Sequence, residues 1–235
     1  VSRVIADHPR ISRATKERVR AVMRELNYQP NAAARSLARQ RTQTIGVALS
    51  RAADAALANP FFPEVLRGIG AAAQQARYSL NLTTATTYEE ESRQSIELLT
   101  QRRVDGLVLL ASHTNDPLVD WLAEHHYPFV VLGRVPGRDV PHVNNDNVAA
   151  SREATEHLLH LGHRRIAFLG GSLDYVVTVD RLDGYQQALE RAGLQVVSEL
   201  VVTTDFSYEQ AHAAARHLLA EERPTAVVAI DDGAA

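Results

Sequence analysis

Residues 104–111 read VDGLVLLA, an almost continuous apolar run that contains an Asp-Gly pair near its start. A strand of a parallel sheet is covered by helices on both faces, so it reads as a continuous apolar run and not as an alternating one. Amphipathic patterns at 89–103 and 116–126 lie on either side, as crossover helices would. The stretch therefore predicts a buried strand of an α/β fold.

The same alternation continues along most of the chain in two series. The series end in similar runs, VDGLVLL (104–110) and TAVVAID (225–231), and a polar break at HVNNDN (142–147) separates them. We therefore expect two similar lobes with parallel sheets, 44–144 and an incomplete 145–235. The predicted strands are 44–50, 78–85, 104–111, 128–133, 165–171, 194–202 and 225–231, and the predicted helices are 63–78, 89–103, 116–126, 147–163, 180–193 and 207–222.

The first 43 residues have a different pattern, which predicts helix, turn, helix, turn and short helix. A helix end at 1–7 is followed by a helix at 14–26, for which Ser12 is the expected N-cap. Pro30 precedes a short third helix at 31–39. The apolar face of the second helix is predicted to comprise Ala14, Val19, Val22, Met23 and Leu26.

Charge divides the chain at the same place. Residues 1–43 carry ten basic and three acidic side chains, a net charge of +7, whereas residues 44–235 carry 15 basic and 25 acidic side chains, a net charge of −10. A basic head on an acidic body favours contact with a polyanion, with a solvated basic tail as the alternative.

Composition restricts the class of protein. The chain has no cysteine, which excludes disulfides, Cys-ligated zinc and thiol nucleophiles and suits a cytoplasmic location. No apolar run approaches the ~18 residues that span a membrane. The chain starts at Val1 without an initiator Met or signal peptide and stops just after a strand-like run, so we expect a fragment clipped at both ends.

Catalytic and cofactor motifs are missing from the sequence. Gly170-Gly171-Ser172 lacks the rest of a P-loop, and no GxSxG elbow is present. His157, His160 and His163 have no carboxylate that would complete a metal site, so a helix end is the preferred interpretation. We therefore expect neither enzymatic activity nor a cofactor.

The motifs resemble one known family. SRVIADHPRISRATKERVRAVMRELNYQPNAAARSLARQRTQTIGV is similar to the head of the lactose/galactose repressor (LacI/GalR) family, and VDGLVLL, LGHRRIAFLGG, RLDGYQQAL and PTAVVAIDDGAA resemble its ligand-binding body. The resemblance implies a two-lobed effector domain of the type I periplasmic-binding-protein fold (44–235). A partial helix-turn-helix head and hinge helix (1–43) would precede it, without the family's first helix and most of its second.

The resemblance also implies DNA contacts. Ser2 and Arg3 match positions for a phosphate and a base contact; an Arg fork suits guanine, with phosphate-only contact as the alternative. Ala6 stands where many relatives have Asn, which would remove one phosphate contact. The predicted DNA-binding residues are Ser2, Arg3, Arg10, Ser12, Thr15, Tyr28, Asn31, Ala34 and Leu37.

The predicted helix at 31–39 is too short to be stable alone in water. Its Ala33, Ala34 and Leu37 share one face. In the family, paired hinge helices enter the minor groove of DNA and a leucine opens a base step. The alternative is a plain connector with Leu37 packed on the body.

For the effector, the resemblance implies a cleft between the lobes. Phe61 and Phe62 would stack on a ring, with Phe62 expected to face the cleft more than Phe61. Asp231 stands where many relatives have Asn. For Asp146, the alternative to an effector contact is that its side chain caps the following helix. The predicted effector-binding residues are Phe61, Phe62, Asp146, Arg181, Phe206 and Asp231.

Together these features predict a ligand-responsive transcriptional repressor that binds a pseudo-palindromic operator as a homodimer in the bacterial cytoplasm. Sugars are the family's commonest effectors, and NPFFPEVLRGI resembles members that control maltose or oligosaccharide genes; purines and nucleosides stay open. A solute-binding receptor of a transporter is the rival, since it would share the body but not the basic head. A third possible class of protein, an α/β enzyme, is disfavoured because the sequence lacks a catalytic set of residues.

Overall fold

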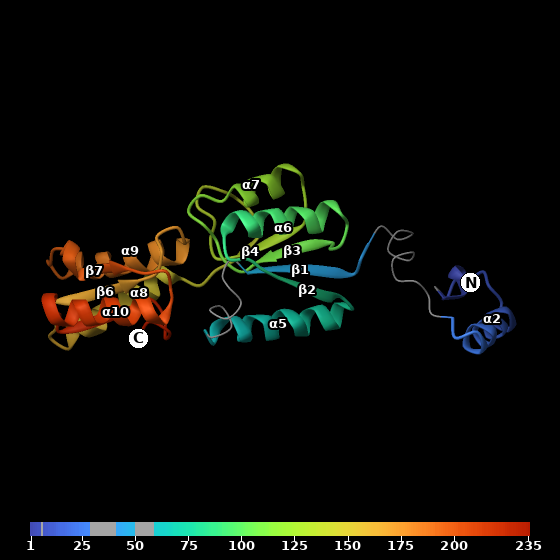
Figure 1. Cartoon of the computed structure of the whole chain (residues 1–235), viewed down its shortest axis with the longest axis horizontal. Helices are drawn as coiled ribbons and strands as arrows, with labels where there is room; N and C mark the ends of the chain where they lie inside the picture. The colour runs from blue at the N-terminus through green and yellow to red at the C-terminus, as the bar shows by residue number, and fades with distance from the viewer. Residues whose placement is uncertain (6, 29–40, 50–58) are drawn as a thin grey trace. The chain divides into compact units, whose positions relative to one another are not determined.

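The computed structural model describes residues 1–5, 7–28, 41–49 and 59–235 (Figure 1). Contacts divide the chain into two compact units, residues 1–42 and 43–235. The predicted short helix at 31–39 lies outside the described residues, and so do the candidate DNA contacts Asn31, Ala34 and Leu37.

Two helices form the described part of the first unit, α1 (Ser2–Ile5) and α2 (Arg13–Glu25). The Ser12 hydroxyl accepts a hydrogen bond from the Thr15 amide at 3.3 Å, so the predicted N-cap is confirmed. Asn27 ends α2 in the left-handed region with φ of 47°, and the Tyr28 amide donates to the Met23 carbonyl at 2.8 Å. This pair closes the helix as a Schellman motif does.

The predicted apolar face of α2 is not a buried face in the structure. No residue of α2 is buried; Val22 is 46% exposed and Leu26 71% exposed. Ala14 is also exposed, and Val19 and Met23 are half-buried. Little covers this face among the described residues, because α1 is one turn long and contributes Val4 as a buried side chain.

The second unit contains two lobes. The N-lobe has a five-stranded sheet in the order β2-β1-β3-β4-β5, and every pairing in it is parallel. Its strands are β1 (Thr44–Leu49), β2 (Ser79–Thr84), β3 (Gly106–Leu109), β4 (Phe129–Leu132) and β5 (His142–Val143), and its helices are α5 (Phe61–Ala76), α6 (Tyr88–Thr100) and α7 (Pro117–Glu124). The predicted parallel sheet is confirmed, and the apolar run at 104–111 contains β3, which lies near the centre of the sheet.

Helices cover both faces of the N-lobe sheet, with α6 and α7 on one side and α5 on the other (Figure 1). Alternate residues of β1 therefore enter different cores: Ala48 packs with α6 and α7, whereas Val47 and Leu49 pack with Phe62 of α5. Burial on both faces explains why the strands are continuous apolar runs.

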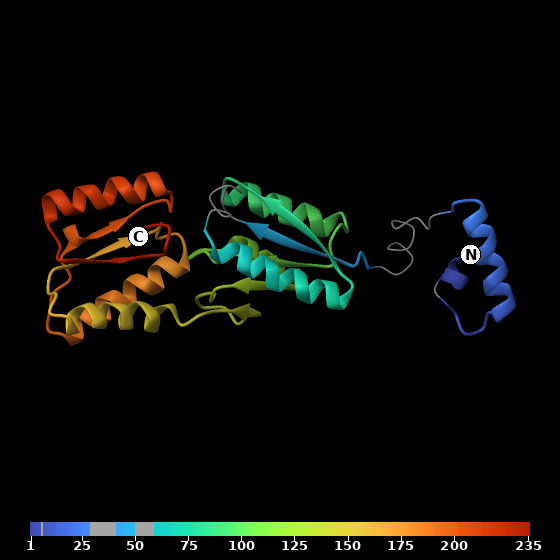
Figure 2. The same ribbon diagram turned by 90° about the horizontal axis from the view of Figure 1, so that it is seen from below.

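The C-lobe repeats this plan with a three-stranded parallel sheet in the order β7-β6-β8. Helix α10 covers one face, and α8 and α9 cover the other (Figure 2). Its elements are α8 (Asn147–His160), β6 (Ile166–Gly170), α9 (Val176–Arg191), β7 (Val201–Thr203), α10 (Tyr208–His217) and β8 (Ala226–Ala229).

Three predicted elements differ from the structure. The strand expected at 194–202 is a short 3-10 turn (Ser198–Leu200) followed by β7, because Leu200 turns into the core ahead of the sheet. Strand β5 lies in the segment that was expected to be a polar break. Its two exposed residues form no apolar run from which a strand could be predicted. The last five residues of the helix expected to reach 222 form a π-helical turn, Leu218–Glu222. No described helix is long and apolar enough to cross a bilayer.

A buried carboxylate lies in the N-lobe core. Glu91 of α6 is 4% exposed, and its Oε2 has no hydrogen-bond partner among the described residues. Asp116, which caps α7 by accepting from the Val119 amide at 3.1 Å, is the neighbouring charge. Burial first and then the negative charge of Asp116 raise the pKa of Glu91 to about 8.

The raised pKa of Glu91 predicts pH-dependent stability. From about pH 5 to pH 8 the folded chain keeps a proton that the unfolded chain has released, so the free energy of unfolding should fall by about 1.4 kcal/mol per pH unit and then level off. Glu91→Gln should remove this slope, and the exposed Glu97→Gln on the same helix should keep it. Urea unfolding at several pH values measures both; an unchanged slope in Glu91→Gln would disprove the assignment.

Candidate effector cavity and DNA-binding head

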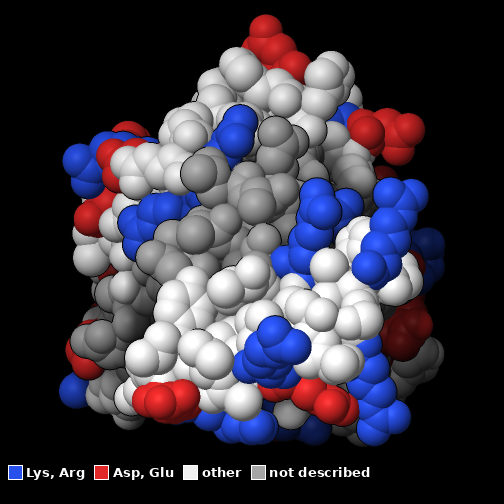
Figure 3. All heavy atoms as spheres, turned by 90° about the vertical axis from the view of Figure 1, so that its right-hand side faces the viewer, with Lys and Arg blue, Asp and Glu red and all other residues white. Residues whose placement is uncertain are grey.

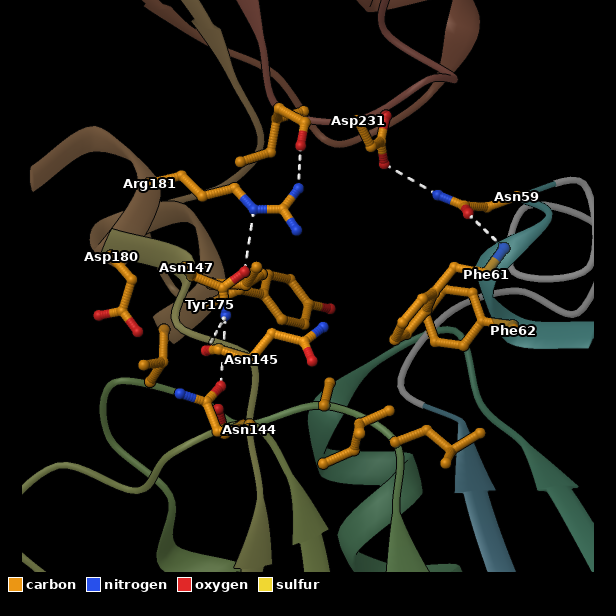
Figure 4. Close-up of a pocket in the computed structure, with 18 of the residues that line it drawn as sticks. Asn59, Phe61, Phe62, Asn144, Asn145, Asn147, Tyr175, Asp180, Arg181 and Asp231 are labelled. Carbon is orange, nitrogen blue, oxygen red and sulfur yellow. Dashed lines mark hydrogen bonds between the residues drawn. The ribbon is translucent and has the colours of Figure 1, made fainter. Parts of the chain in front are cut away.

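A cavity of about 490 Å³ lies between the two lobes of the second unit. This volume is within the range of about 300–1,000 Å³ that is usual for small-molecule sites. Its walls include residues that follow β3, β4, β5 and β8, so it lies at the carboxyl ends of parallel strands. Figure 4 shows Arg181 and Asp231 of the C-lobe across the cavity from Phe61 and Phe62 of the N-lobe.

Arg181 is held in place by two bonds from its guanidinium. Its Nε donates to Oδ1 of Asn147 at 3.1 Å, and its Nη1 donates to the carbonyl of Ile230 (Figure 4). Burial lowers the pKa of Arg181, and the charges of Asp231 and Asp232 oppose that shift. The side chain therefore faces the cavity as a fixed donor group.

Asp231 accepts hydrogen bonds from two sides. Its Oδ1 accepts from the Ala234 amide at 3.0 Å, and its Oδ2 accepts from the side-chain amide of Asn59 at 2.9 Å. Asn59 belongs to the N-lobe, so this second bond crosses the cavity (Figure 4).

Aromatic rings supply the apolar part of the cavity. Phe61, Phe62, Tyr175 and Phe206 all line it. The rings of Tyr175 and Phe206 meet edge to face with centroids 5.4 Å apart. Phe206 has a left-handed backbone with φ of 68°, an uncommon conformation for a bulky residue that is often found at functional sites.

Gly171 makes room for the ring of Phe206. A Cβ atom at Gly171 would lie 2.1 Å from the Phe206 ring, which no real contact allows. The glycine after β6 therefore serves to admit the aromatic side chain, and nothing in the described residues joins it to an anion site.

Phe62 differs from its expected role. It is only 7% exposed and packs with Val47, Leu49 and Leu110 in a core cluster, whereas Phe61 is 43% exposed. Both rings border the cavity, but Phe61 offers the larger accessible surface. Phe62 was expected to face the cleft more than Phe61, but most of its ring packs in the core cluster and Phe61 is the more accessible of the two.

Asp146 is placed outside the cavity. Its carboxylate caps α8 by accepting from the Ala149 amide at 2.9 Å, and Asn144, Asn145 and Asn147 line the cavity instead. The helix cap that was the alternative for Asp146 is therefore what the structure contains, and the effector role is corrected.

A second cross-lobe contact joins Arg134 of the N-lobe to Asp180 of the C-lobe. The Arg134 Nε lies 2.9 Å from both carboxylate oxygens of Asp180, whose side chain is 2% exposed. Nearby, the Val176 amide donates to the Ser112 carbonyl at 3.0 Å. A buried carboxylate in one lobe thus has its cation in the other lobe.

Removing the Arg134 side chain should therefore weaken the contact between the two lobes. Arg134→Ala leaves Asp180 without its cation, and we expect a loss of about 1–3 kcal/mol in the free energy of unfolding, below the cost for a fully buried pair because Arg134 is 42% exposed. The radius of gyration from small-angle scattering should also rise. Arg138→Ala is the matched control, since its partner Asp120 lies in the same lobe and is 54% exposed. Equal effects in both variants would contradict this role.

The described part of the head carries exposed cations. Arg3 and Arg10 are exposed and make no ion pair with another described residue, whereas Lys16 and Arg20 both contact Asp7 at 3.0 Å. The Lys16 hydrogen bond and charge lower the pKa of Asp7. Figure 3 shows several separate Lys and Arg side chains on the face in view, with Asp and Glu mainly toward its margins.

Three of the other predicted DNA contacts, Ser12, Thr15 and Tyr28, occupy accessible positions. Ser12 and Thr15 lie at the exposed start of α2, where their hydroxyls are 2.9 Å apart. Tyr28, just beyond α2, is 50% exposed. Ser2 belongs to α1.

Sequence reasoning missed several cavity residues. Asn59, Arg134, Tyr175 and Asp180 line the cavity but were not among the predicted site residues. Asn147, the last residue of the polar break between the lobes, was not among them either, yet it accepts a hydrogen bond from Arg181. Asp180 could have been predicted as a cavity residue because it directly precedes Arg181. The sequence around Arg134 gives no comparable indication.

Two parallel-sheet lobes with a polar and aromatic cavity at the carboxyl ends of their strands define a ligand-binding domain of the periplasmic-binding-protein type. Residues 42–235 match the family described as periplasmic binding proteins and sugar binding domain of LacI family, and residues 1–31 match bacterial regulatory proteins, lacI family. The chain belongs to the LacI family of bacterial regulatory proteins.

Individual relatives agree with this placement. The HTH-type transcriptional regulator MalR of Streptococcus pneumoniae serotype 4 is 43% identical over 210 residues, which cover 89% of this chain and 64% of MalR. The HTH-type transcriptional regulator CelR of Thermobifida fusca is 40% identical over 222 residues, 93% of this chain and 65% of CelR. The chain thus spans slightly less than two-thirds of the length of these relatives.

A solved structure, the transcriptional regulator CelR–cellobiose complex, matches with a TM-score of 0.73 and 36% sequence identity. The match covers 97% of this chain and 68% of that one. The similarity therefore extends over the head as well as both lobes.

Proposed function

We propose that this chain is part of a sugar-responsive transcriptional repressor that binds operator DNA as a homodimer in the bacterial cytoplasm. The observation that carries the proposal is the cross-lobe cavity, lined by aromatic faces and by fixed polar groups, on the same chain as a basic helical head. Aromatic rings suit the apolar faces of a sugar ring, and amide, guanidinium and carboxylate groups suit its hydroxyls.

The two units have different roles in this proposal. The head (1–43, with the hinge helix at 31–39) binds DNA, and residues 44–235 bind the effector. Arg3 supplies a base contact, while Ser2, Arg10, Ser12, Thr15 and Tyr28 contact the backbone. Asn31, Ala34 and Leu37 form the hinge contact in the minor groove.

The switch is a shift in population between two states. An effector that binds one arrangement of the lobes better than the other changes how the two hinge segments of the dimer meet on DNA. A coupling free energy of about 1–3 kcal/mol is typical of such systems. The effector contacts are assigned to Phe61, Phe62, Arg181, Phe206 and Asp231.

A saccharide is the effector class best supported. The chain is similar over nearly its whole length to a regulator whose structure contains cellobiose, and its cavity combines the ring faces and hydroxyl partners that a sugar needs. The rival function, a solute-binding receptor of a transporter, is disfavoured by the regulatory head matched at residues 1–31.

The test is a gel shift of the full-length protein with promoter DNA, with and without cellobiose and maltose. We expect specific DNA binding that one of the sugars changes. Binding should weaken steeply as salt rises, because Lys and Arg contacts release counterions from the phosphates. Failure to bind any DNA at low salt would refute the regulator, and sugar binding without DNA binding would favour the receptor.

A further inference from the structure

A short backbone bridge joins the loop after β3 in the N-lobe to the start of α9 in the C-lobe. His113 of the loop pairs with Tyr175 in an isolated antiparallel bridge. Two backbone hydrogen bonds flank the pair, one at 2.8 Å from the Thr114 amide to the Asp174 carbonyl and one at 3.0 Å from the first amide of α9. The start of α9 is therefore fixed to the N-lobe at His113.

The His113 ring lies between two tyrosines, one from each lobe. Its centroid is 4.5 Å from that of Tyr88, the first residue of α6, and 4.6 Å from that of Tyr175. The Tyr175 ring lines the cavity and meets the ring of Phe206 there (Figure 4). His113 itself is not one of the residues that line the cavity. A row of four rings thus connects the N-lobe to the aromatic wall of the cavity.

The N-lobe end of this row is anchored. The Tyr88 hydroxyl donates to Oδ1 of Asp116 at 2.7 Å and accepts from the Leu118 amide at 2.9 Å. Asp116 is 1% exposed, and its Oδ2 accepts from the His113 amide at 3.4 Å. Because the loop and the ring against which His113 packs are both held by a buried carboxylate, His113 has a defined position from which to hold Tyr175.

We propose that His113 is a positioning residue for effector binding: it holds the Tyr175 ring of the cavity wall in place from the opposite lobe without contacting the sugar. This inference rests on the proposed sugar response. A ring that is already fixed loses less conformational entropy when a ligand packs beside it, so the sugar binds more tightly. Since the two rings come from different lobes, sugar affinity also depends on how the lobes pack together.

The experiment is calorimetric titration of cellobiose and maltose into the full-length protein and its variants. His113→Ala removes the ring between the two tyrosines, and His113→Phe restores a ring without the imidazole nitrogens. Tyr175→Leu removes the ring that His113 positions, and it is measured alone and combined with His113→Ala. The control is His125→Ala, because the exposed His125 stacks on Trp121 within the N-lobe, with centroids 4.4 Å apart, and does not line the cavity.

We expect His113→Ala to bind the sugar roughly tenfold more weakly than wild type, because each aromatic pair that it loses is worth roughly a two- to tenfold change in an equilibrium constant. His113→Phe should recover most of this loss, and His125→Ala should match wild type. In the Tyr175→Leu background, His113→Ala should cause no further loss, since its effect passes through Tyr175.

Three results would overturn the inference and leave the proposed function intact. They are wild-type affinity in His113→Ala, additive losses in the double variant, and a loss in His113→Phe as large as that in His113→Ala. The phenylalanine variant keeps the ring packing, so it decides the question even if His113→Ala folds poorly. If wild type binds neither sugar, the sugar response itself is refuted, and the role of His113 with it.

Discussion

Replacing Arg181 with alanine is expected to abolish the sugar response while operator binding persists. The guanidinium is held between Asn147 and the Ile230 carbonyl and faces the cavity beside Asp231. Its loss removes charge-assisted donors and leaves the carboxylates of Asp231 and Asp232 without this cation. Affinity for the effector should therefore fall at least a hundredfold, about 2.7 kcal/mol. Calorimetry with cellobiose and maltose and a gel shift with operator DNA measure the two properties separately.

Two further variants sharpen this prediction. Arg181→Lys keeps the charge but cannot make both fixing bonds from one planar group, so it should recover little of the lost affinity. Arg165→Ala removes an arginine of the same lobe that pairs with Glu222 outside the cavity, and it should bind sugar like wild type. Induction that survives unchanged in Arg181→Ala would place the effector site elsewhere.

Gly184→Ala is expected to destabilise the C-lobe severely. Helices α8 and α9 pack so closely at this glycine that a Cβ atom would lie 2.2 Å from the Val148 carbonyl oxygen and 2.9 Å from the Arg152 amide nitrogen. Both obstructing atoms belong to the backbone of α8, so no side-chain rotation relieves the clash. We expect a loss of about 3 kcal/mol or more in the free energy of unfolding.

The matched control is the same substitution at an open helical glycine. Gly68 of α5 has no atom within 4 Å of a built Cβ, so Gly68→Ala should be neutral or stabilise by up to about 1 kcal/mol, as helix propensity predicts. Urea unfolding monitored by circular dichroism compares the two. Similar stability in both variants would show that α8 and α9 can move apart at no cost.

Much of the fold could be read from local pattern. The continuous apolar run at 104–111 predicted a buried parallel strand because both faces of such a strand are covered, and β3 fulfils this. Ser12 predicted a helix start because its hydroxyl satisfies an amide three residues later. These features depend on residues close in sequence, so the chain itself carries the signal.

Other elements gave a weak or misleading signal. Strand β5 has two exposed residues, His142 and Val143, and no apolar run. The apolar positions Val22 and Leu26 predicted one apolar face of α2, and that face is exposed in the described residues. Periodicity shows which side of an element is apolar and cannot show what packs against it.

The sequence by itself determined the order of elements, the parallel sheets, the charge division between head and body, and the family resemblance that pointed to Arg181 and Asp231. Only the tertiary structure decided that Asn59 reaches Asp231, that Arg134 pairs with buried Asp180, and that Phe62 packs in the core while Asp146 caps a helix. The physical reason is range. Periodicity and capping act between residues a few positions apart, whereas each cross-lobe bond requires two lobes to be folded and packed before its donor and acceptor can meet.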